Sequence, residues 1–136
     1  MTKKQITNLL YGVIFAAIAL YAAYSKGWIL ADFESISPQQ AYSLLQRDEN
    51  VTLLDVRTPE EFAEGHIEGA ILIPVQVLNE NLSKLQSAKG GNIIVYCHSG
   101  NRSVAASRIL VKNGFIPLNV KGGISGWKSE GLSVSQ

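Results

Sequence analysis

The distribution of apolar side chains divides the chain into an N-terminal apolar segment and a longer region of alternating pattern. From Ile6 to Tyr24 nearly every residue is apolar, and Thr7 and Asn8 are the only strongly polar members. As a helix rising about 1.5 Å per residue, this segment would be roughly 29 Å long, close to the hydrocarbon thickness of a bilayer. Because it has no polar face, the pattern favours a membrane-spanning helix over a buried core helix.

The residues around this segment leave two interpretations open, an uncleaved anchor and a cleaved secretory signal. A cleavage site needs small residues, which Tyr21 and Tyr24 interrupt near the end of the segment, and this favours the anchor. Lys3 and Lys4 precede the segment, whereas only Lys26 follows closely. This basic excess predicts a single-pass membrane protein whose N-terminus lies in the cytoplasm and whose domain lies outside it. A domain on the cytoplasmic face, or secretion after cleavage, is the alternative.

After residue 30, short apolar runs alternate with amphipathic segments. We expect strands over residues 33–36, 51–56, 71–73, 92–96 and 116–120. We expect helices that begin near residues 37 and 58, extend over 75–85, follow residue 103 and cover 122–130. Strands that alternate with helices predict an α/β fold in which helices cover both faces of a parallel sheet. Residues 1–30 would then form the anchor and linker, and residues 31–136 a single domain.

Two of the expected helices have clear start signals. Ser37 and Thr58 are each followed by a proline, which suits the first helical position. The third helical position carries Gln40 in one helix and Glu61 in the other, as a capping box requires. Gly65 is suited to end the second of these helices.

Composition and charge exclude several classes of function. The chain has 136 residues, of which 46% are hydrophobic and 17% charged, and its formal net charge is +1. Without a basic stripe, nucleic acid is not expected as a partner. The single cysteine excludes an intramolecular disulfide and a multi-cysteine zinc site, and the two histidines leave little material for any metal site. We therefore expect neither a metal nor a cofactor.

The single cysteine, Cys97, lies between an expected buried strand and an expected helix. At such a junction, loop N–H groups and the positive helix end favour a thiolate and can cradle an anion. Arg102 adds a planar fork of donors. The pattern predicts nucleophilic chemistry by Cys97 on a small anionic group. The substrate contacts are expected from the residues that follow it: His98, Ser99, Gly100, Asn101, Arg102 and Ser103.

Two charged residues near the end of another strand are candidates for a supporting role. Ligands of parallel sheets bind beyond the carboxyl ends of strands, and Asp55 lies near such an end. We expect Asp55 to hold neighbouring loops in place. We expect Arg57 to pair with Glu60 or Glu61, and His66 to satisfy backbone groups in a turn.

Three segments, in this order, carry a resemblance to a known family. They are Leu54–Arg57 with Pro59–Phe62, Gly65–Ala70 and Ile73–Pro74; then Tyr96–Ser103; then Gly122–Trp127. Over residues 36–132 the chain resembles a rhodanese-type sulfurtransferase domain. The resemblance implies a three-layer α/β/α fold on a central parallel sheet of about five strands, here behind one transmembrane helix.

The length of the cysteine loop separates this family from its relatives. Four residues lie between Cys97 and Arg102, which is similar to the sulfurtransferase loop. Tyrosine phosphatases, cell-cycle phosphatases of the same fold and arsenate reductases have five residues there, which widens the loop for phosphate or arsenate. Tyr96 also stands where tyrosine phosphatases usually have a histidine. Phosphatase activity is therefore the weaker enzymatic interpretation.

The resemblance implies a reaction in two covalent steps. Cys97 would take the outer sulfur of a thiosulfate-like donor as a persulfide, and then pass it to cyanide, a small thiol or a thioredoxin-like protein. The alternative is a non-enzymatic or persulfide-carrying rhodanese module that serves a membrane partner. The complete loop around Cys97 counts against an inactive module.

Overall fold

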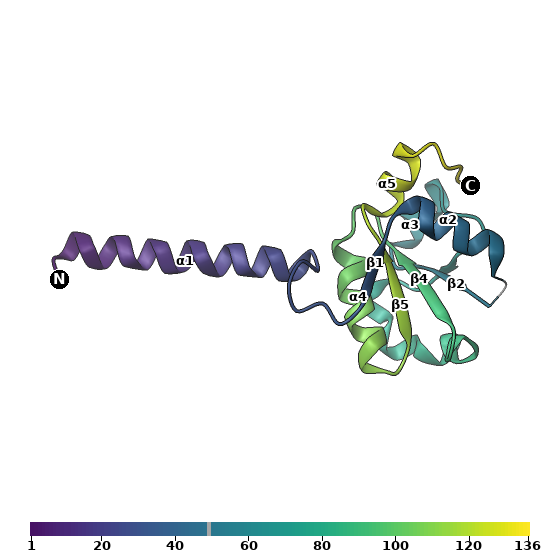
Figure 1. Cartoon of the computed structure of the whole chain (residues 1–136), viewed down its shortest axis with the longest axis horizontal. Helices are drawn as coiled ribbons and strands as arrows, with labels where there is room; N and C mark the ends of the chain where they lie inside the picture. The colour runs from purple at the N-terminus through teal and green to yellow at the C-terminus, as the bar shows by residue number, and fades with distance from the viewer. Residues whose placement is uncertain (49) are drawn as a thin grey trace. The chain divides into compact units, whose positions relative to one another are not determined.

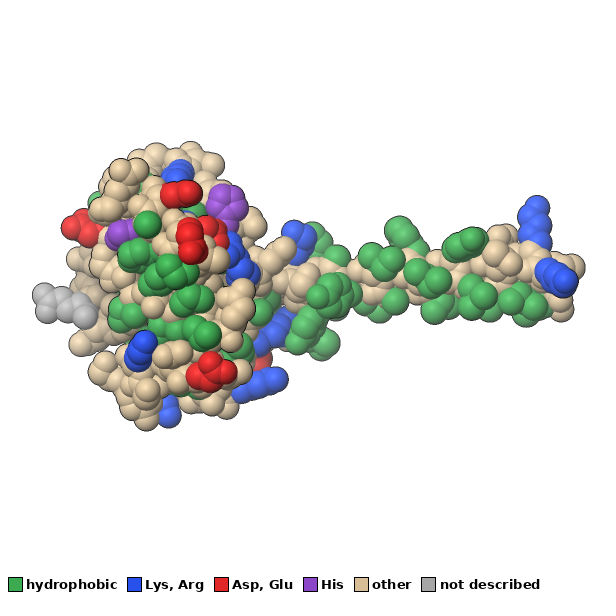
Figure 2. Space-filling model, turned by 180° about the vertical axis from the view of Figure 1, so that it is seen from behind, with side chains coloured by type: hydrophobic (Ala, Val, Ile, Leu, Met, Phe, Trp, Pro, Cys, Tyr) green, Lys and Arg blue, Asp and Glu red, His purple; other side chains and the backbone are tan. Residues whose placement is uncertain are grey.

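The computed structural model describes residues 1–48 and 50–136, which form two compact units, Met1–Ala31 and Asp32–Gln136. The first unit contains α1 (Lys3–Ser25), which begins with a capping box between Thr2 and Gln5. No residue of α1 is buried, and hydrophobic side chains follow it along its length (Figure 2). By length and composition α1 could cross a membrane, although a signal sequence has the same properties.

The second unit is built on a sheet of five strands, all paired in parallel (Figure 1). The strands are β1 (Glu34–Ile36), β2 (Thr52–Asp55), β3 (Ile71–Leu72), β4 (Asn92–Tyr96) and β5 (Ile116–Val120). Their order in the sheet is β1-β5-β4-β2-β3. The predicted α/β fold with a parallel sheet is confirmed. Because β4 is the middle strand, the residue that follows it lies at the centre of the carboxyl edge of the sheet.

Four α-helices connect and cover the strands. They are α2 (Pro38–Arg47), α3 (Pro59–Glu64), α4 (Asn101–Lys112) and α5 (Gly123–Ser129). The predicted capping boxes are confirmed: Ser37 and Thr58 each accept a hydrogen bond from the backbone three residues on, at Gln40 and Glu61. Gly65 is the C-cap of α3, as predicted.

The helix predicted over residues 75–85 is present, but its geometry is 3₁₀ and not α. The chain forms two 3₁₀ segments, η1 (Val75–Val77) and η2 (Asn79–Ala88), and Asn81 leaves helical geometry inside the second. The apolar spacing explains the difference. Val75 and Leu78 are three residues apart, as are Leu82 and Leu85, and this interval matches the three residues per turn of a 3₁₀-helix.

Two hydrophobic clusters lie on opposite faces of the sheet. Alternate residues of a strand point to opposite faces, so Ile93 and Val95 belong to one cluster, and Ile94 and Tyr96 to the other. The first cluster includes side chains of α4 and η2, and the second includes side chains of α2 and α5. Cys97 continues the alternation and belongs to the α4 side.

Candidate active site

Cys97 follows β4 directly and sits at the centre of the carboxyl edge of the sheet. Gly100 adopts a left-handed conformation with φ of 119° and turns the chain into α4. This turn brings the Gly100 amide within 3.0 Å of Cys97 Sγ, to which it donates a hydrogen bond. Cys97 Sγ also lies 3.4 Å from Ser103 Oγ, and Cys97 is only 1% exposed. The Cys97 thiol is thus buried, and it contacts the Gly100 amide and the Ser103 hydroxyl of its own loop.

The first turn of α4 supplies further donors beside the thiol. Val104 N donates to Gly100 O at 3.3 Å, whereas the amides of Asn101, Arg102 and Ser103 find no protein acceptor within residues 1–48 and 50–136. The first amides of an α-helix have no intrahelical partner, and they form its positive end. The sequence predicted a ring of loop amides around the sulfur. In the described structure, Gly100 alone among these residues has its amide within hydrogen-bond distance of Sγ.

The other residues predicted for substrate contacts lie around the same loop. His98, Ser99 and Asn101 are exposed, Arg102 is half-buried and Ser103 is buried. Ser103 Oγ donates to Gly100 O at 3.2 Å. The structure therefore brings all six predicted contact residues together, with three of them on the open side.

The start of α5 is bound to the back of the cysteine loop. Ile124 N donates to Cys97 O at 2.9 Å, and Ser125 N donates to His98 O at 3.1 Å. Gly123, at φ of 57°, approaches the loop so closely that a Cβ there would lie 2.4 Å from Cys97 O. A residue other than glycine at this position would displace the loop. The sequence showed the Gly122–Trp127 motif but not this contact.

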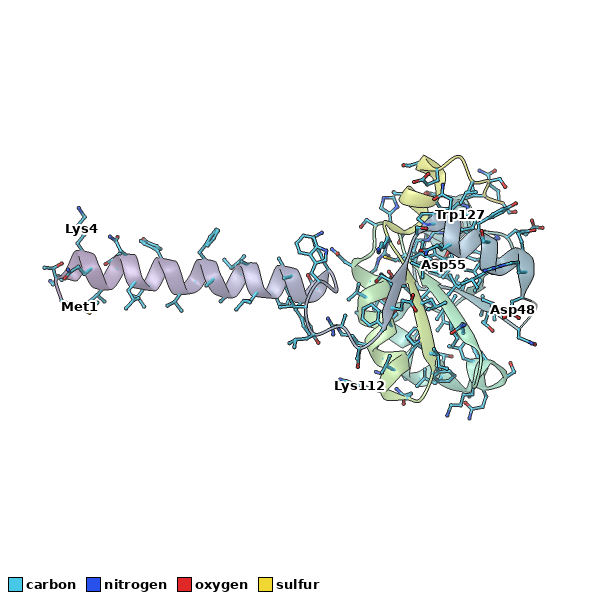
Figure 3. The ribbon with its side chains drawn as sticks, in the orientation of Figure 1. Met1, Lys4, Asp48, Asp55, Lys112 and Trp127 are labelled. Atoms are coloured by element: carbon cyan, nitrogen blue, oxygen red, sulfur yellow. The ribbon has the colours of Figure 1, made fainter. Side chains whose placement is uncertain are left out.

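A buried ion pair lies at the end of β2, beside the end of the strand that precedes Cys97. Arg57 Nη2 lies 2.7 Å from Asp55 Oδ2 and donates a second hydrogen bond to Gly65 O at 2.8 Å. The backbone amide of Arg57 also donates to Asp55 Oδ1 at 3.0 Å. Figure 3 labels Asp55, which lies in the interior of the second unit. Asp55 thus holds the loop after β2, as predicted, and Arg57 connects it to the end of α3.

Burial and the charge of Asp55 both affect the pKa values of Arg57 and Tyr96. Burial alone would lower the pKa of Arg57, but the hydrogen bond and negative charge of Asp55 outweigh it and raise the pKa. Burial, followed by the charge of Asp55, also raises the pKa of Tyr96. Tyr96 lies beside Asp55 in the register of β2 and β4, and its hydroxyl accepts a hydrogen bond from Ile67 N at 3.1 Å. Arg57 is therefore charged, while Tyr96 is neutral.

A second ion pair joins α3 to the first turn of α4. Arg102 Nη1 lies 2.6 Å from Glu61 Oε1, and Arg102 Nη2 lies 2.9 Å from Glu61 Oε2. The predicted pairing of Arg57 with Glu60 or Glu61 is wrong, because Arg57 is bound to Asp55 and Glu61 to Arg102. Hydrogen bonds from Arg102 lower the pKa of Glu61 from 4.5 to about 2, and the same contact raises the pKa of Arg102.

The prediction for His66 is confirmed. His66 Nδ1 lies 3.0 Å from Phe62 O, and its ring stacks on Phe62 with 3.7 Å between the ring centroids. The backbone of His66 pairs with Ser135. His66 thus joins the end of α3 to the C-terminal segment of the chain.

A pocket of about 330 Å³ opens beside the cysteine loop. Its walls include the Glu61–Arg102 pair, His98, Glu64 and Lys128. A larger hollow of about 660 Å³ lies between α2 and the β1–β5 edge, and no loop residue lines it. In the part of the chain that the structure describes, no group of three or more potential ligand side chains could hold a metal ion. The smaller pocket thus adjoins the cysteine loop at His98 and Arg102.

Comparison with known proteins places this geometry in context. Residues 37–130 match the family described as Rhodanese-like domain. The chain is 36% identical to a sulfurtransferase of Allochromatium vinosum, over 76% of this chain and 91% of that protein. It is 38% identical to the chloroplastic thiosulfate sulfurtransferase 16 of Arabidopsis thaliana, over 72% and 89%. A rhodanese-related protein from Thermoplasma volcanium superposes with a TM-score of 0.69 at 35% identity, covering 76% of this chain and 98% of that one.

Proposed function

Because this chain belongs to the rhodanese-like domain family, we propose that residues 31–136 move a sulfane sulfur from a thiosulfate-like donor through a persulfide on Cys97. The observation that carries the proposal is the position of Cys97 Sγ. It lies at the carboxyl edge of a parallel sheet, beside the N-terminus of α4, and accepts a hydrogen bond from the Gly100 amide. A sulfur anion at this place is stabilised by an amide dipole and by the positive helix end.

The first step is attack on the donor. The Cys97 thiolate attacks the outer sulfur of thiosulfate, a new S–S bond forms, and the old S–S bond breaks. The bonding electron pair leaves with sulfite, and Cys97 carries the persulfide. We assign the Gly100 amide and the first amides of α4 to stabilise the anionic persulfide. We assign the contacts with the donor to His98 and Arg102, which line the pocket, and to the exposed Ser99 and Asn101.

The second step returns the enzyme to its first state. A nucleophile such as cyanide, a small thiol or a thioredoxin-like protein attacks the outer sulfur of the persulfide, and the electron pair returns to Cys97 as thiolate. The pocket of about 330 Å³ is large enough for a small acceptor, and its open side exposes His98 and Lys128. These features support a small acceptor and leave room for a protein thiol at the rim.

Mass spectrometry of the intact protein tests this proposal directly. After incubation with thiosulfate, we expect the mass to rise by one sulfur atom and to fall again when cyanide is added. Cys97→Ser is the matched control, because it keeps the size of the side chain and the Gly100 contact. Sulfur transfer by Cys97→Ser at the wild-type rate, or a wild-type protein that gains no sulfur from any sulfane donor, would refute the proposal.

The alternative role is a persulfide carrier for a membrane partner. The observation that favours it is α1, an apolar helix with no buried residue, which is joined to the rhodanese-like unit. A carrier would accept sulfur in the same mass experiment but would turn over slowly with cyanide or free thiols. Fast turnover with a small acceptor supports the enzyme, and a single loading without turnover supports the carrier.

We propose in addition that α1 holds the protein in the bacterial inner membrane with the domain on the periplasmic side. Lys3 and Lys4 before α1 support this orientation under the positive-inside rule. Figure 3 labels Met1 and Lys4 at the N-terminal end of this helix. N-terminal sequencing of the protein from washed membranes, with protease treatment of spheroplasts, tests it. A start after residue 20 would indicate a cleaved signal, and protection from protease would indicate a cytoplasmic domain.

A further inference from the structure

The guanidinium of Arg102, in the cysteine loop, is already bound to a carboxylate. Both terminal nitrogens of Arg102 donate to the two carboxylate oxygens of Glu61, at 2.6 and 2.9 Å. This bidentate arrangement is the one by which a guanidinium binds a carboxylate or another oxyanion of similar shape. Glu61 therefore takes the donors that the sulfonate end of thiosulfate would otherwise use.

Glu61 is held in this position independently of Arg102. Its Oε1 accepts hydrogen bonds from the amide of Thr58 at 3.3 Å and from Thr58 Oγ1 at 3.2 Å, as the third residue of α3 in the capping box. Its pKa of about 2 means that the carboxylate is charged at any pH at which the protein would work. The side chains of Glu61 and Arg102 are 30% and 32% exposed, so a substrate in the pocket can reach them.

The rest of the pocket adds little positive charge. Arg57 reaches its wall, but the charge of Arg57 is balanced by Asp55. Lys128 is exposed at the rim, and Glu64 lines the same pocket. Both arginines of the described pocket are thus bound by carboxylates, which is an unusual surface for a donor with two negative charges.

We propose that Glu61 is a specificity-determining residue that competes for Arg102 and disfavours dianionic donors relative to organic persulfides of low charge. The inference rests on the function proposed above and refines its donor. Thiosulfate must approach Cys97 against the charge of Glu61 or displace Glu61 from Arg102. An organic persulfide RSSH meets neither obstacle, because it has no sulfonate.

The chemistry of such a donor is balanced without a further reactant. The Cys97 thiolate attacks the outer sulfur of RSSH, and a bond forms between Cys97 Sγ and that sulfur. The S–S bond of the donor breaks, the thiolate RS⁻ leaves with the electron pair, and the proton stays on the transferred sulfur. Cys97 reaches the same persulfide as with thiosulfate.

The test compares two donors on the purified full-length protein. The rate of the sulfur mass gain is measured with thiosulfate and with 2-hydroxyethyl persulfide, for wild type and for Glu61→Gln. The glutamine keeps the capping box, because that position accepts Gln as well as Glu. It removes the charge, which would raise the ratio of the thiosulfate rate to the hydroxyethyl persulfide rate about tenfold, as expected for a like charge removed at contact distance.

Glu64→Gln is the matched control. It removes the same charge from the same pocket but leaves Arg102 bound to Glu61. We expect it to change the rate ratio by less than about threefold, because the exposed charge acts only through solvent. An unchanged ratio in Glu61→Gln, or an equal rise in Glu64→Gln, would overturn the inference while leaving the sulfur transfer itself intact. A wild-type protein that gains sulfur from neither donor would instead overturn the proposed function, and the inference with it.

Discussion

Two arginine–carboxylate pairs flank the cysteine loop, and they differ in their surroundings. The side chains of Arg57 and Asp55 are 5% and 0% exposed, and this pair lies at the end of β2. The side chains of Arg102 and Glu61 are about a third exposed, and this pair lies on the wall of the pocket. Breaking a buried pair leaves an unpaired charge without water, whereas an exposed pair exchanges readily with solvent. The same guanidinium–carboxylate pairing is therefore part of the buried interior at Arg57 and part of the pocket surface at Arg102.

The largest expected effect is the loss of the buried pair. Asp55→Ala leaves the Arg57 guanidinium buried without its anion, and we expect the free energy of unfolding to fall by about 3–5 kcal/mol. Urea unfolding followed by circular dichroism measures it. In Asp55→Ala/Arg57→Met no charge is left unpaired, so the loss should be smaller than the sum of the two single variants. A loss below 1 kcal/mol in Asp55→Ala would remove the distinction between the two pairs.

The second effect concerns Gly123, where α5 approaches the cysteine loop. In Gly123→Ala, the positive φ and the collision with Cys97 O combine, and we expect a loss of about 2–4 kcal/mol. Gly131→Ala is the control, because Gly131 has a φ of 76° but no atom within 4 Å of an added Cβ. It should lose only about 1 kcal/mol from the backbone conformation. Equal losses in the two variants would contradict the close approach of α5 to the loop.

A smaller effect is expected for the hydroxyl next to the buried pair. Tyr96→Phe leaves the amide of Ile67 without its acceptor in a buried place. We expect a loss of about 1–3 kcal/mol, measured by the same unfolding experiment. An unchanged free energy of unfolding would mean that another group accepts the hydrogen bond from the Ile67 amide. Substitutions near the buried pair would then cost less stability than its burial implies.

The exposed pair should affect stability least. We expect Glu61→Gln to change the free energy of unfolding by less than about 1 kcal/mol, because solvent screens the pair. The pKa of Glu61 is lower in the folded protein than its ordinary value of 4.5, so the contribution is present above that pH. It is lost as the pH falls towards about 2, where the folded carboxylate takes up a proton. Unfolding of wild type and Glu61→Gln should therefore differ at neutral pH and converge in acid.

What could be predicted from the sequence depended on how local the signal was. The capping boxes at Ser37 and Thr58 involve residues three positions apart, so the sequence contains all of the interaction. The strand and helix alternation is also local, and it led to the parallel sheet. The apolar spacing over residues 75–85 was local too, but it fits α- and 3₁₀-helices nearly equally well, so it predicted a helix without its type.

The partners around the loop could not be predicted in the same way. Glu61 and Arg102 are 41 positions apart, and only the folded sheet brings α3 beside α4. Arg57 has carboxylates at several nearby positions, and the burial of Asp55 decides among them. The role of Gly123 likewise depends on how closely α5 approaches Cys97. The sequence predicted a set of candidate site residues but not which of the side chains around the loop bind one another.

The attachment of α5 to the cysteine loop has one further consequence, for the direction of peptide planes. In a trans peptide the C=O and the N–H point in opposite directions, and no cis bond occurs among the described residues. The carbonyls of Cys97 and His98 are turned towards α5 by Ile124 and Ser125. The N–H groups of His98 and Ser99 must therefore point the opposite way. The start of α5 thus sets the direction of two peptide dipoles in the cysteine loop.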